Sequence, residues 1–269
     1  MPRLAGFPMY DFPEIRTATD AFWQAFSDEL HTRGITDRPS SLTRATDLPA
    51  FWRNDDLLIG QTCGYPMMIG MCGKARYIAS PCYTTPHSHG AFHKSLIISR
   101  KGGPIRTLAD AHHKICAINM ADSNTGMNVL RLEIAKLKPH GTFFSRVYET
   151  LAHRKSMHAV AQGDADIAAI DCVTFAHVER FDPQLIAQLS IIAETEETPT
   201  LPFITSSKTD DATLAHLRAA LLAVTAAPHH RAICDRLMLQ SVEILGADAY
   251  HRVREIEDRA IMLGYPQLV

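Results

Sequence analysis

The sequence lacks a long apolar run, an excess of charge of one sign and any CxxC pair of cysteines. A helix that spans a bilayer needs roughly 20 consecutive apolar residues, so no membrane-spanning segment is expected. The formal net charge is -2 at pH 7, and the Lys and Arg residues form no long cluster. Because nucleic-acid-binding surfaces are strongly basic, nucleic acid is not an expected partner either.

The N-terminal segment MPRLAGFPMYDFPE also lacks the features of a secretory signal. It contains neither a long apolar core nor a small-residue cleavage site. We therefore expect either a cytoplasmic chain or a periplasmic one from which a signal peptide has been removed.

The six cysteines do not indicate a disulfide framework. Cys116 and Cys172 lie within apolar stretches that are typical of buried strands. Unpaired cysteine is among the most buried residue types in proteins. We therefore predict free, buried thiols.

The 14 histidines raise the question of a metal site. Neighbouring histidines on a helix point to different faces, which disfavours the pairs at 112–113 and 229–230 as chelates. The group His87, His89 and His93 lies in a polar loop, and no HExxH-type helix motif accompanies it. We predict no metal and no cofactor.

What the sequence does contain is a regular alternation of short apolar stretches and helical patterns. The predicted strands include DLLIGQ, ARYIASPCY, KSLIISRK, KICAIN, DIAAID and LPFITSSK, a further strand is expected within 41–48, and the pattern from residue 210 onward is helical. This alternation indicates an α/β architecture with largely parallel sheets. We predict a first lobe from residues 1–100 and 205–269 and a second, inserted lobe from 101–204. Two crossings, near 95–105 and 200–208, would join them.

Polar side chains gather where the predicted strands end. Ligands of open α/β sheets bind outside the carboxyl ends of strands, and clefts between lobes are favoured sites. The residues at these positions suit a small polar or anionic solute, and they are Tyr10, Gln61, Tyr65, Ser95, Ser123, Asn124, Thr125, Gly126, His153 and Asp171.

The stretch NMADSNTGMNVL, residues 119–130, is the most informative of these strand ends. It leads from an apolar strand through small polar residues and Gly126 directly into a helix. The first amides of a helix have no intrahelical acceptor and lie at the positive end of its dipole, and glycine permits close approach of a ligand. An ordinary N-cap by Asp122, Ser123 or Asn124 explains the same pattern, so both interpretations stay open.

Four segments in order, DLLIGQTCGYPM, CAINMADSNTGMNVLR, AHRKSMHAVAQGDADIAAIDCVTF and PTLPFITS, resemble a known family. The chain is similar, from about residue 4 to 265, to the phosphate/phosphite/phosphonate-type substrate-binding proteins of ABC transporters. These proteins form a branch of the type 2 periplasmic-binding-protein fold. The resemblance implies a two-lobed fold with a ligand cleft between the lobes, and a membrane permease that receives the ligand.

The resemblance also implies roles for particular residues. The phosphoryl oxygens would be held by the helix-start turn, which here is Ser123, Asn124, Thr125 and Gly126 with the amides of Met127 and Asn128. Tyr65 of the first lobe would close over the ligand, His153 would contact it, and Asp171 would meet an amine of a phosphonate. Tyr10 is placed by its strand position. We expect a small phosphoryl-type oxyanion as the ligand.

Two other functions remain alternatives. An enzyme on the same fold would use Cys63 as a thiolate nucleophile with His153 as its base, and a cytoplasmic sensor would bind its ligand without a permease. His153 is also consistent with a solvated residue at a helix start, and Asp171 with the cap of the next helix. We expect a binding protein rather than an enzyme.

Overall fold

The computed structural model describes residues 3–71, 73–139, 141–246 and 248–269. The chain forms two compact units. Unit 1 contains the N-terminal part up to Phe92 and Pro199–Ala249, and unit 2 contains His93–Thr198 and Tyr250–Val269. The chain therefore passes between the units three times, whereas two crossings were predicted. The segment from Tyr250 onward groups with unit 2 rather than with the first lobe.

Unit 1 is built around a mixed sheet of order β1-β2-β12-β3-β13. Its elements are β1 (Leu4–Gly6), η1 (Pro8–Tyr10), η2 (Pro13–Ile15), α1 (Arg16–Thr32), α2 (Leu48–Trp52), β2 (Leu57–Gln61), η3 (Pro66–Gly70), β3 (Ala75–Tyr83), β4 (Ser88–His89), β12 (Phe203–Ser206), α7 (Asp211–Ala226), η6 (Pro228–His230), α8 (Arg231–Arg236) and β13 (Leu239–Glu243).

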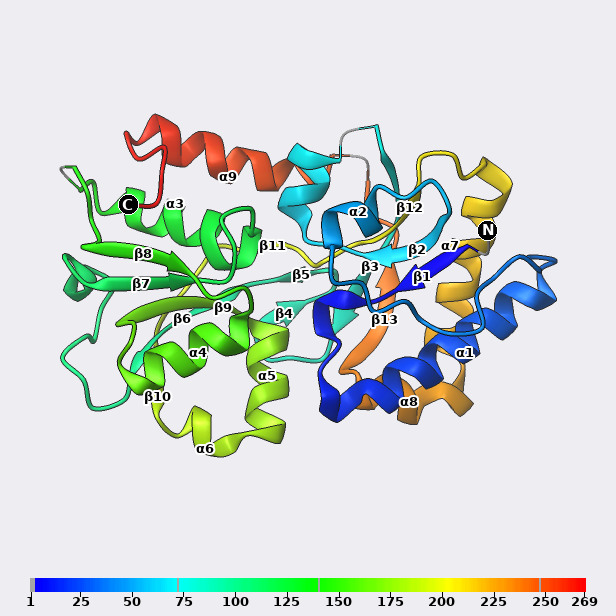
Figure 1. The fold of residues 1–269 in the computed structure, drawn as a ribbon, viewed down its shortest axis with the longest axis horizontal. Helices are drawn as coiled ribbons and strands as arrows, with labels where there is room; N and C mark the ends of the chain where they lie inside the picture. Colours follow the sequence, from blue (N-terminus) through cyan, green and yellow to red (C-terminus); the bar gives the residue numbers. More distant parts are fainter. Residues whose placement is uncertain (1–2, 72, 140, 247) are drawn as a thin grey trace. The chain divides into compact units, whose positions relative to one another are not determined.

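Helices cover the unit 1 sheet because their apolar residues recur at helical spacing. β1 and β2 run parallel, whereas β12 is antiparallel to both of its neighbours. α1 packs on α7 and α8, and α7 packs on β3 and β13, while α2 contacts β2 and β12 (Figure 1). The cluster beneath α2 is fully apolar and contains Phe51, Trp52, Leu57, Met71 and Ile204.

Unit 2 has its own mixed sheet, of order β10-β6-β9-β7-β8. Its elements are β6 (Ser95–Arg100), η4 (Ala109–Ala111), β7 (Ile115–Ile118), η5 (Asn124–Asn128), α3 (Val129–Lys136), β8 (Arg146–Glu149), α4 (His153–Gln162), β9 (Ile167–Asp171), α5 (Cys172–Phe181), α6 (Pro183–Ile186), β10 (Leu189–Glu194) and α9 (His251–Met262). The short strands β5 (Phe92–His93) and β11 (Thr198–Pro199) contain two of the passages between units.

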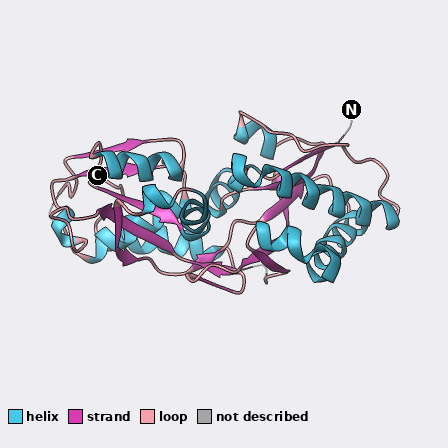
Figure 2. Cartoon of the chain, turned by 90° about the horizontal axis from the view of Figure 1, so that it is seen from below, coloured by secondary structure: helices cyan, strands magenta, loops and turns pink. Residues whose placement is uncertain are grey.

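The central strands of unit 2 are buried on both faces, which explains their almost wholly apolar composition. β7 pairs in parallel with β8 and β9, and β6 is antiparallel to β9. Figure 1 shows α3 and α9 side by side on one face of this sheet and α4 and α5 on the other. Figure 2 shows strands lying between helices in both units.

Most predicted strands lie where the pattern placed them, and three expectations were wrong. The sheets are mixed rather than largely parallel, because β12, β13, β6 and β10 enter as antiparallel strands. Residues 41–46 form no strand. β13 was missed because a register shift between Leu239 and Ser241 breaks the alternation of buried and exposed side chains by which a strand is recognised.

Two further expectations concern cysteines and membrane helices. Within the described residues, Cys63, Cys82, Cys116, Cys172 and Cys234 are free and buried, as predicted, while Cys72 lies outside the described residues. Across the same part of the chain, no helix combines the length and apolar character that a bilayer crossing requires.

Candidate functional site

The predicted helix-start turn is a buried π-helical turn, η5, that continues into α3. Ser123 caps it, because its Oγ accepts a hydrogen bond from Gly126 N at 3.1 Å. The first backbone bond of the turn joins Asn128 N to Ser123 O at 3.0 Å. The amides of Thr125 and Met127 precede that bond and so have no acceptor within the helix. The N-cap interpretation is therefore confirmed for Ser123, and the anion-binding interpretation stays a prediction.

The two asparagines of the turn hold it in place from behind. Asn124 Nδ2 donates to Thr198 Oγ1 at 3.0 Å, and Asn128 Nδ2 donates to Asn124 Oδ1 at 3.1 Å and to Val253 O at 2.9 Å. Arg131 Nη2 donates to Asn128 Oδ1 at 2.7 Å. The asparagine side chains thus contribute rigidity, and the buried Arg131 fixes Asn128.

Gly126 has a packing role in addition to the one expected of it. A Cβ at this position would lie 1.8 Å from Asn119 Oδ1 and 3.2 Å from His153 Cε1. The glycine therefore makes room for two side chains of unit 2. Its backbone φ is not in the left-handed region, so the crowding by Asn119, and not a special backbone conformation, requires glycine here.

His153, at the first position of α4, contacts the turn directly. Its Nε2 lies 2.9 Å from Thr125 Oγ1. The residue is partly exposed, although its Nδ1 is inaccessible to solvent. Burial lowers the pKa of His153 below its ordinary value, while Asp171 opposes that shift. The imidazole is therefore neutral near pH 7.

Asp171, at the end of β9, is 1% exposed and caps α5. Its Oδ1 accepts hydrogen bonds from Val173 N and Thr174 N, each at 2.9 Å, and its Oδ2 lies 3.4 Å from His93 Nδ1. Ser95 is its partner in the β6–β9 ladder and is also buried. The carboxylate therefore has a structural role, which the sequence offered only as the alternative.

Of the candidate residues of unit 1, Gln61 and Tyr10 both contact Tyr83. Gln61 is buried, and its Nε2 donates to Tyr83 OH at 3.1 Å and to Leu201 O at 3.2 Å. Tyr10 packs edge-on against Tyr83, with ring centroids 5.5 Å apart. Tyr65 is partly exposed and immediately precedes η3. Both protons of the Gln61 amide are thus used inside unit 1.

The residues of the alternative enzyme, Cys63 and His153, belong to different units. Cys63 is buried at the end of β2. Among the described residues, no group of three or more His, Cys, Asp or Glu side chains is placed to hold a metal ion. Neither unit by itself therefore assembles the nucleophile and base that this alternative needs.

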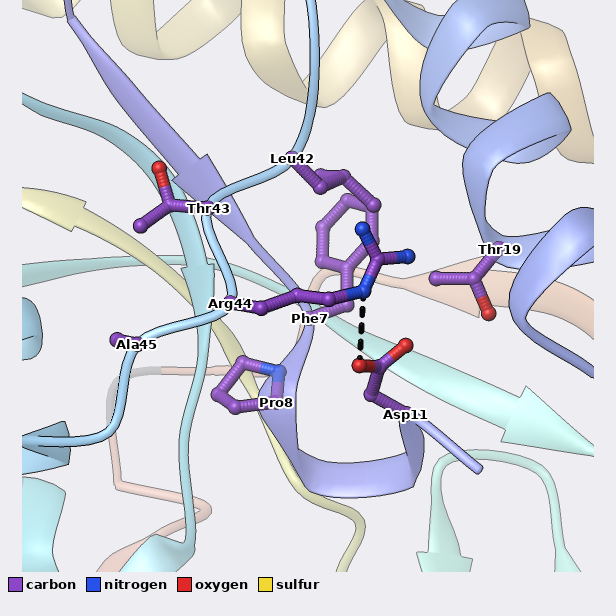
Figure 3. Close-up of a pocket in the computed structure, with 8 residues that line it drawn as sticks. All are labelled: Phe7, Pro8, Asp11, Thr19, Leu42, Thr43, Arg44 and Ala45. Atoms are coloured by element: carbon purple, nitrogen blue, oxygen red, sulfur yellow. Dashed lines mark hydrogen bonds and ion pairs between the residues drawn. The ribbon is translucent and has the colours of Figure 1, made fainter. Parts of the chain in front are cut away.

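A separate cavity of about 220 Å³ lies in unit 1 and is lined by Phe7, Pro8, Asp11, Thr19, Leu42, Thr43, Arg44 and Ala45 (Figure 3). Arg44 Nε lies 3.0 Å from Asp11 Oδ2, and Arg44 Nη2 lies 2.8 Å from Asp20 Oδ1. The cation of this cavity is thus neutralised by two carboxylates. An anion has little to gain there.

Sequence reasoning missed three residues around the turn in unit 2 and the side-chain role of a fourth. Asn119 lies within the quoted stretch but was assigned no contact, Asn128 was expected to contribute only its backbone amide, and Arg131 follows on the same helix. Their signal was the density of amides around a predicted helix start. His93 was considered only as part of a metal group, whereas it is 1% exposed beside Asp171.

Two α/β units, each with a mixed sheet, are the architecture of the periplasmic-binding-protein class. The sequence matches the family described as ABC transporter, phosphonate, periplasmic substrate-binding protein over residues 5–250. The chain belongs to this family, which confirms the resemblance seen in the sequence. No curated protein matches the chain in sequence.

Solved structures share the fold at low sequence identity. The chain is similar to a binding-protein component of an ABC phosphonate transporter from Pseudomonas aeruginosa, with TM-score 0.78, 16% identity and coverage of 98% of this chain and 88% of that one. It is also similar to PhnD1 from Prochlorococcus marinus, solved with methylphosphonate, with TM-score 0.77, 13% identity and coverage of 96% of this chain and 98% of that one. A third similar structure is XAC2383 from Xanthomonas citri, solved with chloride ion, with TM-score 0.75, 15% identity and coverage of 97% of this chain and 98% of that one. These likenesses confirm the fold.

Proposed function

We propose that this substrate-binding protein takes a small phosphoryl-type oxyanion, a phosphonate, phosphite or phosphate, at the turn Ser123–Asn128 and delivers it to an ABC-transporter permease. The observation that carries the proposal is the turn itself. It is buried and capped, and it leaves the amides of Thr125 and Met127 with no acceptor within the helix. An anion at a helix start satisfies such groups and gains from the helix dipole.

The donors of the turn supply part of the binding free energy. The amides of Thr125 and Met127 and the hydroxyls of Ser123 and Thr125 offer at most about four charge-assisted hydrogen bonds, each worth roughly 1.5–3 kcal/mol. Micromolar binding needs about 8 kcal/mol after the costs of association. Contacts from His153 and from unit 1 are therefore needed beside the turn.

His153 is the second proposed contact in unit 2. It is partly exposed beside Thr125 and is held by the packing around Gly126. Tyr10 and Tyr65 are the proposed contributions of unit 1. We assign Gln61 to the scaffold, because its amide protons are used within unit 1. Asp171 acts through its neighbours rather than as a partner for a ligand amine, since one of its oxygens already caps α5.

The family to which the chain belongs is periplasmic, and we propose the same compartment for this chain. We also propose that it binds without catalysis. Support comes from the family, whose members are substrate-binding proteins of a transporter.

Titration calorimetry against a panel of solutes tests the ligand class. Methylphosphonate, phosphite and phosphate are expected to bind at micromolar concentration or below, whereas a neutral sugar and a cationic amino acid are not. Thr125→Ala should weaken the binding of the oxyanions. Thr32→Ala is its control and should leave binding unchanged, because Thr32 ends α1 in unit 1 and is exposed. Tight binding of the sugar or the cation, with none of the oxyanions, would overturn the proposal.

A further inference from the structure

The buried residues His93 and Asp171 and the partly exposed His153 form a cluster of ionisable side chains in unit 2. His93 Nδ1 lies 3.4 Å from Asp171 Oδ2, and His93 Nε2 has no hydrogen-bond partner among the described residues. His153 interacts electrostatically with both Asp171 and His93. An imidazole held in a dry site beside a carboxylate has an unused capacity to accept a proton.

The hydrogen bond between His153 and Thr125 shows what such a proton would change. His153 Nε2 lies 2.9 Å from Thr125 Oγ1, whereas Nδ1 is inaccessible to solvent and has no hydrogen-bond partner among the described residues. When the ring proton is on Nδ1, the bare Nε2 accepts the hydroxyl proton of Thr125. The Thr125 hydroxyl is then occupied and has no proton left for a ligand.

We propose that binding of the phosphoryl anion is coupled to uptake of one proton by His153. The proton comes from solvent and adds to Nε2, whose N–H then donates to Thr125 Oγ1. The Thr125 hydroxyl proton is released from its bond to the ring and turns to a phosphoryl oxygen. One proton thus adds both a positive charge and a donor. This inference rests on the proposed ligand class.

The cluster is built to hold one added proton rather than two. The charge of Asp171 raises the pKa of both His93 and His153 against the larger effect of burial, and a positive charge on His93 would lower the pKa of His153. Other ionisable side chains on neighbouring elements are paired elsewhere or exposed: Lys94 with Glu194, Arg131 with Glu257, Arg154 with Asp182, and the exposed Asp122, Lys155 and His158. His177, on α5, stacks on Phe181.

The consequence is an affinity that depends on pH. Above the pKa of free His153 and below that of the liganded form, each pH unit lowers the affinity for the fully ionised anion by up to about tenfold. A site with a fixed Arg or Lys would show no such loss in this range. The protein would therefore hold its ligand more tightly in mildly acidic surroundings.

Calorimetry in buffers with different heats of ionisation counts the protons taken up when methylphosphonate binds. We would compare the intact protein with His153→Gln across neutral pH, because the difference between them cancels the ligand's own ionisation. Between the pKa of free His153 and that of the liganded form, the intact protein is expected to take up nearly one proton more per ligand than His153→Gln. Above and below this pH range the difference should vanish. His177→Gln, another buried histidine of unit 2, should match the unaltered protein.

The outcomes separate this inference from the proposed function. Absence of oxyanion binding to the intact protein overturns both. Oxyanion binding with equal proton uptake in the intact protein and in His153→Gln overturns the coupling alone. If His153→Gln does not fold, the proton uptake of the intact protein alone is used. The ionisation of methylphosphonate, measured in a separate titration, is subtracted from it. A corrected uptake near zero at every pH overturns the coupling.

Discussion

An alanine at position 126 is the sharpest test of how the turn is packed. Its Cβ would lie 1.8 Å from Asn119 Oδ1 and 2.8 Å from Asn119 Cγ, far inside contact distance. Overpacking of this kind costs about 1–3 kcal/mol, whereas Gly→Ala within a helix gains roughly 0.5–1 kcal/mol. Gly126→Ala is therefore expected to lower the free energy of unfolding by about 0.5–2 kcal/mol and to weaken anion binding.

The double variant Asn119→Ala/Gly126→Ala isolates the cause. Removing the Asn119 amide opens the space that the new Cβ needs, so the two substitutions should be coupled by more than about 1 kcal/mol. Urea unfolding should be followed by circular dichroism, because the two tryptophans, Trp23 and Trp52, both lie in unit 1. The contact between position 126 and Asn119 would be refuted if the change in free energy of unfolding of the double variant equalled the sum of the two single changes to within about 0.5 kcal/mol.

Three further predictions follow from individual contacts. Thr125→Ala should weaken phosphonate binding about tenfold because one donor is lost, and Thr125→Ser should restore most of the affinity in calorimetry. Glu196 pairs with Arg259, Lys136 and Arg252, and the hydrogen bonds from Arg259 and Lys136 lower its pKa from 4.5 to about 2. Glu196→Gln should therefore cost about 1–2 kcal/mol at neutral pH, and urea titrations should show this difference disappear as pH falls from about 4.5 toward 2. Gln61→Ala should lower thermal stability while changing phosphonate affinity less than about twofold, because its bonds lie within unit 1.

The elements that were predictable from sequence are those whose pattern is local. β3 spans Ala75–Tyr83, the apolar stretch that was quoted for it, and β6 and β9 coincide with runs rich in isoleucine. α4 ends at Gly163, whose φ of 87° is left-handed, as a helix-stopping glycine should be. Local chemistry also located the turn at Ser123.

The misses depend on partners that are distant in the chain. The amphipathic pattern of α9 predicted a helix but could not say which sheet it would cover, and the structure packs it against α3. The bonds of Asp171 to Val173 N and Thr174 N, and the contact that Gly126 leaves open for Asn119, likewise became visible only in the structure. The predicted ligand contacts of Asp171 and Gly126 stay predictions.

The division of the chain makes the two units unequal in what they need from its C-terminal segment. Every residue of unit 1 precedes Tyr250, whereas unit 2 needs the segment that follows it. Asn128 is held by Val253 O, and Arg131 Nη1 donates to Pro266 O at 2.9 Å. A released chain truncated after Ala249 should therefore retain a folded unit 1, while the turn in unit 2 loses its support and phosphonate binding is lost.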